Sequence, residues 1–304
     1  MLAELSKSFF LTVSQNKFLN KSAKKWGFRL GASQVVADVS LEGAIEKVRE
    51  LNGKGLVCTM DHLGEFVHTR EEAVEATQCV INTLNAIAAS GVDSHVSVKM
   101  TQLGLDIDKE FCLENMTRIM EAAEKNGNFV RIDMEDYAHC QVTIDILKQL
   151  RMKYSNVGTV IQAYLYRSQQ DIQDLEGIPL RLVKGAYKEP PEVAFQDKKD
   201  IDANYLHIIK AHLMSGSYTA VATHDHRIIE LVKQFVKEQE IQHDHFEFQF
   251  LYGFRNELQL QLVKEGYKVR IYTPYGRDWF GYFMRRLAER PQNITFALKG
   301  LFSK

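Results

Sequence analysis

The stretch of sequence that decides the fold runs from Arg270 to Glu289 and reads RIYTPYGRDWFGYFMRRLAE. Ile271 and Tyr272 are β-branched and aromatic residues, which are typical of a strand. Pro274 and the glycine two residues after it are expected to end that strand. From Arg277 onward the residues fit an aromatic-rich helix. The stretch is therefore one strand followed by one helix, and the fold depends on how often this unit occurs.

The polar residues of this expected helix share one face. Tyr282, Arg285, Arg286 and Glu289 stand at positions i, i+3, i+4 and i+7. A guanidinium group binds a planar carboxylate through two parallel hydrogen bonds. The alternative is a solvated surface face that holds one ion pair within the helix. Because the two arginines follow closely after a strand end, we favour a site for a carboxylate.

The strand–helix unit occurs eight times along the chain. Seven further apolar stretches are typical of strands, and each is followed by residues that fit a helix. The first of these helices has a clear start, because Thr69 and Glu72 form the pattern of a capping box, and it is expected to end near Ser90. The expected strands are Leu56–Met60, Val96–Met100, Phe129–Met134, Thr159–Tyr164, Leu180–Ala186, Thr219–Thr223, Phe246–Leu251 and Lys268–Tyr272.

Strands that alternate with helices in this way indicate an α/β protein with a closed (β/α)8 TIM-type barrel. A doubly wound open sheet is the main competitor, but it usually contains fewer such units. Residues 1–52 contain no clear strand and are expected to form an N-terminal helical extension, followed by the barrel in residues 53–304. Because no internal stretch is rich in Pro, Gly or Ser, residues 1–304 are expected to form a single domain.

The composition excludes several classes of protein. The 304 residues carry a net charge of −1, which gives no general attraction to nucleic acid or to an anionic membrane. The basic segment 21–29 is interpreted as a solvated turn rather than a contact with a membrane surface. The four cysteines are scattered and form no C-x-x-C pair, which is typical of a reducing compartment. With no signal peptide and no apolar run of about 20 residues, we expect a cytoplasmic protein.

Charged and polar residues interrupt four of the apolar strands. Arg181 is the second residue of its expected strand, and Lys99, Asp133 and Gln162 lie toward the carboxyl end of theirs. Active sites of such barrels lie at this end. Any one of these residues could be part of an ion pair in the core, because buried charges are costly unless they are paired. The convergence of all four on one barrel mouth favours a ligand site, and its cations favour an anionic ligand.

Other chemical patterns are weak or missing. His224-Asp-His226 ends a strand and could bind zinc, but no further His or Cys completes a set of ligands, so no metal is expected. The chain contains no Rossmann G-x-G-x-x-G after a strand, no P-loop and no G-x-S-x-G elbow. The residues alone therefore indicate a cation-rich barrel mouth without naming its ligand.

A set of segments, one for each strand end, resembles the monofunctional bacterial proline dehydrogenases. Each segment is a weak signal alone, but together, in family order and over roughly residues 56–293, they are specific. The segments are VSVKMTQLG, RIDMED, VIQAY, LRLVKGAY, ATHDH, FEFQFLYG, RIYTP and the Y-x-x-R-R-x-x-E pattern that begins at Tyr282. The resemblance implies FAD-dependent oxidation of L-proline to Δ1-pyrroline-5-carboxylate, the first step of proline catabolism to glutamate. It also implies that FAD passes electrons to a membrane quinone, and it leaves open a peripheral contact with the inner face of the membrane.

The resemblance also implies roles for individual residues. The expected catalytic residues are Asp133 and Arg181. The expected substrate-binding residues are Lys99, Leu251, Tyr272, Tyr282, Arg285 and Arg286. The expected FAD-binding residues are Met134, Gln162, Arg181, Lys184, Gly185, Ala186, Thr223, His224 and Glu289. A gate over the substrate is expected from Glu65 and Arg285.

Two alternatives remain open at this point. One is a metal-dependent barrel hydrolase that uses His224 and His226, and the other is a non-catalytic binder of small amino acids. Both predict a colourless protein. The visible spectrum therefore separates them from a flavin enzyme whose colour bleaches when L-proline is added.

Overall fold

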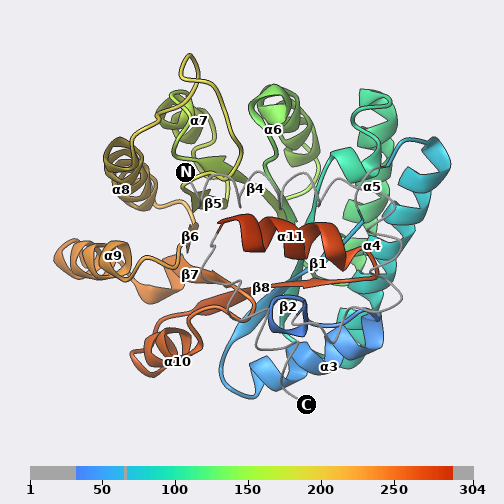
Figure 1. Ribbon diagram of the computed structural model, residues 1–304, viewed down its shortest axis with the longest axis horizontal. Coiled ribbons are helices and arrows are strands. Elements are labelled where there is room, and N and C mark those ends of the chain that lie inside the picture. Colours follow the sequence, from blue (N-terminus) through green and yellow to red (C-terminus); the bar gives the residue numbers. More distant parts are fainter. Residues whose placement is uncertain (1–31, 65–66, 290–304) are drawn as a thin grey trace.

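The computed structural model describes residues 32–64 and 67–289, with the backbone alone for 287–289. Eight parallel strands close into a barrel in the order β1 to β8, so the predicted (β/α)8 barrel is confirmed (Figure 1). Their observed bounds are β1 Val57–His62, β2 Ser94–Val98, β3 Val130–Ile132, β4 Val157–Gln162, β5 Leu180–Val183, β6 Thr219–Ala222, β7 Phe246–Leu251 and β8 Val269–Tyr275.

A helix follows each strand, and the helices after β1 to β7 cover the outside of the barrel (Figure 1). The capping box predicted at Thr69 is present, since its side chain accepts a hydrogen bond from the Glu72 amide at 3.2 Å. The described helices are η1 Ala32–Gln34, α3 Leu41–Asn52, α4 Arg70–Ser90, η2 Thr101–Leu103, α5 Lys109–Lys125, α6 Tyr137–Arg151, α7 Ser168–Asp174, α8 Lys198–Met214, α9 His226–Glu238, η3 His243–His245, α10 Asn256–Lys264 and α11 Trp279–Glu289. Of the helical extension expected in 1–52, residues 1–31 lie outside the described part.

The alternation of side chains along β7 explains how the barrel has an apolar shell and a polar interior. Phe246, Phe248 and Phe250 belong to the main apolar core. Glu247 and Gln249 stand between them and therefore point to the other side of the sheet, into the barrel. Each fully buried Phe contributes roughly 1.5–3 kcal/mol, so the apolar half of this pattern fixes which residues face inward.

The last strand is longer than the sequence predicts. β8 does not end before Pro274 but continues to Tyr275, paired with the end of β1. Along β8 the Tyr272 carbonyl points toward β7, and by alternation the backbone groups of Pro274 point the same way. β7 has already ended at Leu251, and the Pro274 carbonyl accepts from the Ala37 amide at 2.9 Å instead. No backbone N–H group is needed at position 274 for pairing with a neighbouring strand, so proline is tolerated there.

The chain then turns at Gly276, whose φ of +128° few other residues adopt. As a result α11 begins at Trp279, two residues later than the sequence suggests. α11 crosses the carboxyl end of the barrel (Figure 1). An apolar cluster separate from the main core holds it there, and its buried members are Ala32, Val36, Leu63, Trp279, Tyr282 and Phe283.

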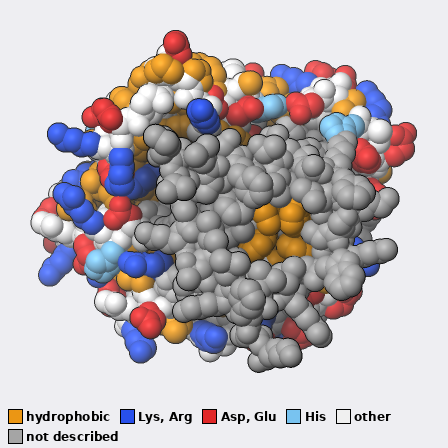
Figure 2. All heavy atoms as spheres, in the orientation of Figure 1, with side chains coloured by type: hydrophobic (Ala, Val, Ile, Leu, Met, Phe, Trp, Pro, Cys, Tyr) orange, Lys and Arg blue, Asp and Glu red, His pale blue; other side chains and the backbone are white. Residues whose placement is uncertain are grey.

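The surface around this end of the barrel carries charges of both signs (Figure 2), in keeping with the net charge of −1. Among the described residues, no helix combines the length and the apolar character needed to cross a membrane.

Candidate functional site

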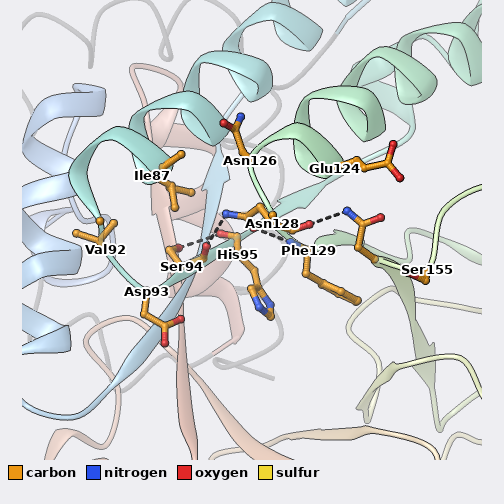
Figure 3. Close-up of a pocket in the computed structure, with 14 residues that line it drawn as sticks. Ile87, Val92, Asp93, Ser94, His95, Glu124, Asn126, Asn128, Phe129 and Ser155 are labelled. Carbon is orange, nitrogen blue, oxygen red and sulfur yellow. Dashed lines mark hydrogen bonds between the residues drawn. The ribbon is translucent and has the colours of Figure 1, made fainter.

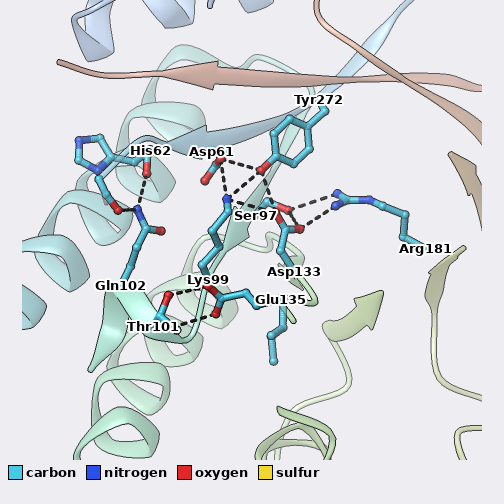
Figure 4. A network of polar contacts seen from close by, with 12 residues as sticks. Asp61, His62, Ser97, Lys99, Thr101, Gln102, Asp133, Glu135, Arg181 and Tyr272 are labelled. Atoms are coloured by element: carbon cyan, nitrogen blue, oxygen red, sulfur yellow. Dashed lines mark hydrogen bonds and ion pairs between the residues drawn. The ribbon is translucent and has the colours of Figure 1, made fainter. Parts of the chain in front are cut away.

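The polar residues at the barrel mouth form one connected cluster around Lys99 (Figure 4). The ammonium Nζ of Lys99, which follows β2, donates to Asp61 Oδ2 at 2.9 Å and lies 3.5 Å from Asp133 Oδ2. It also lies 3.2 Å from the hydroxyl of Tyr272 on β8. Residues from β1, β2, β3 and β8 therefore meet around a single cation, as their strand-end positions predict.

Asp133 is the acceptor that joins the two halves of this cluster. Its Oδ1 accepts from the Ser97 hydroxyl at 2.7 Å and from Arg181 Nη1 at 2.7 Å. Its Oδ2 lies 2.8 Å from the Tyr272 hydroxyl. A carboxylate that accepts from this many donors is fixed in position and stays ionised.

The charges in the cluster stabilise one another. Burial by itself would lower the pKa of Lys99, but the carboxylates of Asp61 and Asp133 outweigh it and hold that pKa above its ordinary value. Burial would likewise raise the pKa of Asp133, but Arg181 and Lys99 outweigh it and hold that pKa below its ordinary value. Burial and the two neighbouring carboxylates hold the pKa of Tyr272 well above its ordinary value, so the phenol stays neutral.

Arg181 spans the barrel interior from β5. Its Nη2 donates to the Ser97 hydroxyl at 3.2 Å, and its Nε donates to Gln249 Oε1 at 2.6 Å. Its guanidinium lies 5.2 Å from the ring centre of Tyr272, a cation–π distance. The expected catalytic pair of Arg181 and Asp133 is thus in direct contact, and Tyr272 is placed beside it.

Apart from Arg181 within β5 and Glu289 on α11, the expected FAD residues lie along the adjoining part of the rim, at the ends of β3 to β6. Gln162 is buried and donates through Nε2 to the Glu135 carbonyl at 2.8 Å. Thr223 accepts from the Asp225 amide at 3.1 Å and can still donate its own hydroxyl proton. Met134 is buried next to Asp133 in the sequence, and Ala186 is exposed at the rim.

Lys184 follows β5 and is held by two carboxylates. Its Nζ lies 2.5 Å from Asp202 Oδ1 and 3.1 Å from Asp225 Oδ2. An Asp at position 225 keeps this ammonium at the rim, which the sequence pattern alone does not indicate. The paired cation can turn toward an anionic group of a ligand because its side chain is 26% exposed.

His224 links the expected cofactor residues to the expected substrate residues. Its Nε2 lies 3.1 Å from the Leu251 amide and accepts its proton, which places the ring proton of neutral His224 on Nδ1. The ring also stacks on Phe254 at 5.2 Å between centroids. Leu251 is thereby fixed at the end of β7, half-buried at the mouth.

The residues at this rim fit a flavin nucleotide. The isoalloxazine ring presents oxygen and nitrogen acceptors, and the pyrophosphate is anionic. The rim supplies matching donors from neighbouring strand ends in the form of an amide, a guanidinium, an ammonium and a hydroxyl: Gln162, Arg181, Lys184 and Thr223.

Gly185 is required at the rim, for a reason that the sequence does not reveal. Gly185 is one of the expected FAD-binding residues, and a glycine can let the backbone approach a cofactor closely. In the structure its φ is +113°, and a Cβ atom would lie 2.2 Å from Cδ1 of the Tyr164 ring. The glycine is therefore needed by the protein itself, whatever the cofactor requires.

We expect Gly185→Ala to lower the free energy of unfolding by about 1–3 kcal/mol, because it adds both strain at a positive φ and a clash. Gly177→Ala is the matched control, since Gly177 also has a positive φ of +79° but nothing within 4 Å of the added atom. Thermal unfolding of both variants measures the difference. Equal melting temperatures would show that the contact with Tyr164 is unimportant.

α11 brings its arginines to the same mouth. Arg286 lies over the buried Tyr282 ring, 5.1 Å from its centre. Burial raises the pKa of Tyr187 to about 12, while the charges of Lys99 and Arg285 oppose the rise. The Tyr187 phenol, which follows β5, therefore feels the charges of both Lys99 and Arg285. Tyr187 itself is 43% exposed.

Two expected site residues cannot be placed. Glu65 and the side chain of Glu289 lie outside the described residues. The gate between Glu65 and Arg285 therefore remains a prediction, and so does the flavin contact of Glu289.

Two members of the cluster were given no role from the sequence. Asp61 is the nearest carboxylate to Lys99, and Ser97 bridges Asp133 and Arg181. Ser97 stands two residues before Lys99 in β2, so it faces the same side of the sheet. This spacing was a usable signal in the sequence. The contact between Asp61 and Lys99 could not be predicted from the sequence, because it depends on the closed geometry of the barrel.

The His-Asp-His segments have other roles. His226 begins α9, and His243 Nδ1 lies 3.1 Å from the Gly266 carbonyl at the surface. Within 32–64 and 67–289, no group of three His, Cys, Asp or Glu side chains is arranged to hold a metal ion.

A hollow of about 610 Å³ lies at the opposite end of the barrel (Figure 3). Its polar groups bind one another: Asn128 Nδ2 donates to the Ser94 carbonyl at 3.0 Å, and Asn156 Nδ2 donates to the Asn128 carbonyl at 2.7 Å. Barrels of this kind place their chemistry at the other end, and the charged cluster is there. We therefore assign this hollow to loop packing.

Comparisons with known proteins agree with this placement. A family model described as proline dehydrogenase matches residues 44–298. The chain is 53% identical over 302 residues to proline dehydrogenase 2 of Bacillus subtilis (strain 168), a match that covers 99% of this chain and 100% of that protein. It is 42% identical over 308 residues to a proline dehydrogenase of Deinococcus radiodurans, covering 99% of both. A crystal structure of proline utilization A (PutA) from Bdellovibrio bacteriovorus superposes with a TM-score of 0.81 and 26% identity, over 90% of this chain and 34% of that longer one.

Proposed function

This chain belongs to the proline dehydrogenase family, which oxidises proline to Δ1-pyrroline-5-carboxylate, and we propose that it does so with FAD bound across the mouth of the barrel. The observation that carries this proposal is the convergence of Lys99, Asp133, Arg181 and Tyr272 from four strands. Such a cluster holds cations in fixed positions where an anionic substrate and an electron-accepting cofactor can meet.

The substrate carboxylate is bound by Lys99, Arg285 and Arg286. Lys99 reaches it from β2, and the two arginines reach it from α11, so the carboxylate is held from two sides of the mouth. Asp61 and Asp133 keep Lys99 in place. The rings of Tyr272 and Tyr282, with Leu251, then leave the substrate ring one orientation, in which its reacting carbon faces the cofactor.

The arrangement of charge also prepares the substrate amine. Proline carries a protonated amine in water, and that proton has to leave before a hydride can. The proposed site brings together four cations, Lys99, Arg181, Arg285 and Arg286, against the three carboxylates of Asp61, Asp133 and Glu135, all of which act on Lys99. This excess of positive charge favours the neutral amine.

The cofactor residues act by position. Gln162, Arg181, Lys184, Gly185, Ala186, Thr223, His224 and Met134 line the rim where FAD would lie, and Glu289 would join them at the end of α11. FAD supplies the acceptor for the hydride that leaves the ring carbon. No side chain is required to act as a nucleophile.

The remaining features of the reaction follow the family. We propose that the reduced cofactor passes its electrons to a membrane quinone, with the protein in the cytoplasm and a peripheral contact at the inner face of the membrane. We also propose that residues 1–304 form one domain, with Glu65 and Arg285 as a gate over the bound substrate.

The direct test is the visible spectrum of the purified protein. We expect the absorption of oxidised flavin, bleached when L-proline is added without oxygen, with one pyrroline-5-carboxylate formed for each flavin reduced. D-Proline, which presents its carboxylate on the other side of the ring, is the control and should bleach it far more slowly. A colourless protein that binds proline unchanged would instead support a non-catalytic binder.

A further inference from the structure

A line of buried polar side chains connects Arg181 to the far end of the barrel. Arg270, Glu247, Gln249 and Arg181 all lie inside it, and none is more than 6% exposed. The first three have no role assigned to them in the proposed function. Buried polar groups are costly unless each finds its partner, and here each does.

The contacts of this line have a fixed direction. Arg270 Nε donates to Glu247 Oε1 at 2.8 Å, and Gln249 Nε2 donates to the same oxygen at 2.5 Å. The hydroxyl of Tyr218 donates to the other oxygen of Glu247 at 2.9 Å. Gln249 Oε1 in turn accepts from Arg181 Nε at 2.6 Å.

The charge of Glu247 decides which way the Gln249 amide points. Burial would raise the pKa of Glu247, but Arg270 outweighs it and lowers that pKa to about 2. An ionised carboxylate can only accept, so Gln249 must present its NH2 group to Glu247. Its carbonyl oxygen is then the end that faces Arg181. With the amide reversed, the NH2 group would face the Arg181 donor and the carbonyl oxygen would face the carboxylate.

We propose that Gln249, oriented by Glu247, is a positioning residue that aims the guanidinium of Arg181 at Asp133. This inference rests on the role of Arg181 in the proposed function. A planar guanidinium that is held at Nε has little freedom to rotate about its long side chain. Its Nη1 and Nη2 are then directed at Asp133 and Ser97, at 2.7 and 3.2 Å. Precise placement of such groups has a large effect on rate.

The first test replaces Gln249 with Met, which has a similar length but cannot accept from Arg181 as an amide oxygen does. We expect the rate at which L-proline reduces the flavin to fall about tenfold or more, the effect of one hydrogen bond to a charged group. The dissociation constant of tetrahydrofuran-2-carboxylate should change less than twofold, because Arg285, Arg286 and Lys99 are untouched. Loss of rate without loss of binding is the result that a merely structural role would not give.

Tyr218→Phe is the matched control. It removes a different hydrogen bond to the same buried carboxylate, one that does not lead to Arg181. The reduction rate of this variant should stay within twofold of wild type, whatever its melting temperature. An equal fall in both variants would mean that the rate follows the stability of the core, and would overturn the proposal.

Gln249→Glu provides a rescue that depends on pH. When the carboxyl group introduced by this substitution is protonated, it can donate to Glu247 and accept from Arg181, as the amide does. Two carboxylates this close inside the barrel cannot both ionise freely, so the proton is held until the pH rises. We expect this variant to reduce flavin within about threefold of wild type at the lower end of the pH range, where the proton is held. A rate no better than that of Gln249→Met at every pH would contradict the proposal.

Arg181→Lys separates this inference from the function on which it rests. If Arg181→Lys loses activity and Gln249→Met does not, the positioning role is wrong but the site assignment stands. If Arg181→Lys keeps wild-type activity and flavin content, the assignment of Arg181 itself is wrong.

Discussion

Replacing Asp133 with Asn is expected to lower kcat/KM for L-proline by about a hundredfold or more. The side chain of Asn can take either of two orientations. Its NH2 group then replaces Oδ1, which faces Ser97 and Arg181, or it replaces Oδ2, which faces Tyr272 and Lys99. In both orientations the NH2 group faces a cationic donor, and the negative charge between Lys99 and Arg181 is lost. Two hydrogen bonds to a charged group, at roughly 1.5–3 kcal/mol each, account for a loss of this size.

Steady-state kinetics with L-proline measures the effect, and Asp171→Asn is its control. Asp171, on α7, forms an ion pair at 2.9 Å with Arg167, the residue before that helix, and is not a member of the cluster. The control makes the same chemical change and should keep nearly full activity. If a folded Asp133→Asn enzyme also kept its activity, Asp133 would not organise the site.

The second large effect is expected from Arg286→Lys. Lysine keeps the positive charge but cannot make the two parallel hydrogen bonds of a guanidinium to a carboxylate. We expect the variant to bind FAD and to lose at least about tenfold in kcat/KM for L-proline, since one charge-assisted hydrogen bond contributes roughly 1.5–3 kcal/mol. The affinity for tetrahydrofuran-2-carboxylate should fall in parallel.

Pyrrolidine is the control substrate for this variant, because it has the ring of proline without the carboxylate. It should be a poor substrate for wild type and for Arg286→Lys alike. Should proline activity survive the substitution while pyrrolidine activity falls, the arginines do not bind the carboxylate, and the proposed orientation of the substrate is wrong.

The fold could be predicted from the sequence because each strand–helix unit has its own local signals. Apolar runs of the right length, breakers between them and a capping box at Thr69 are short-range features, and all eight units were found. The end of β8 could not be predicted. Pro274 is usually a breaker, and only the end of β7 before it explains why the strand continues.

The candidate site was predictable in outline for a different reason. Carboxyl ends of parallel strands meet at one end of a barrel, so Lys99 and Asp133 had to converge if the barrel was correct, and Arg181 reaches them from within β5. Contacts across the barrel interior could not be predicted in this way. The line from Glu247 through Gln249 to Arg181 joins strands β7 and β5, and such distances follow from how the barrel closes.

The central claim is that the carboxylate of the substrate is bound between Lys99 and the two arginines of α11. A crystal structure of the flavin-loaded protein with tetrahydrofuran-2-carboxylate tests it most directly. We expect the carboxylate oxygens at hydrogen-bond distance, about 3 Å, from Lys99 Nζ and the guanidinium of Arg286, with the ring against Tyr272. An analogue bound with its carboxylate directed away from Lys99, Arg285 and Arg286 would contradict the account.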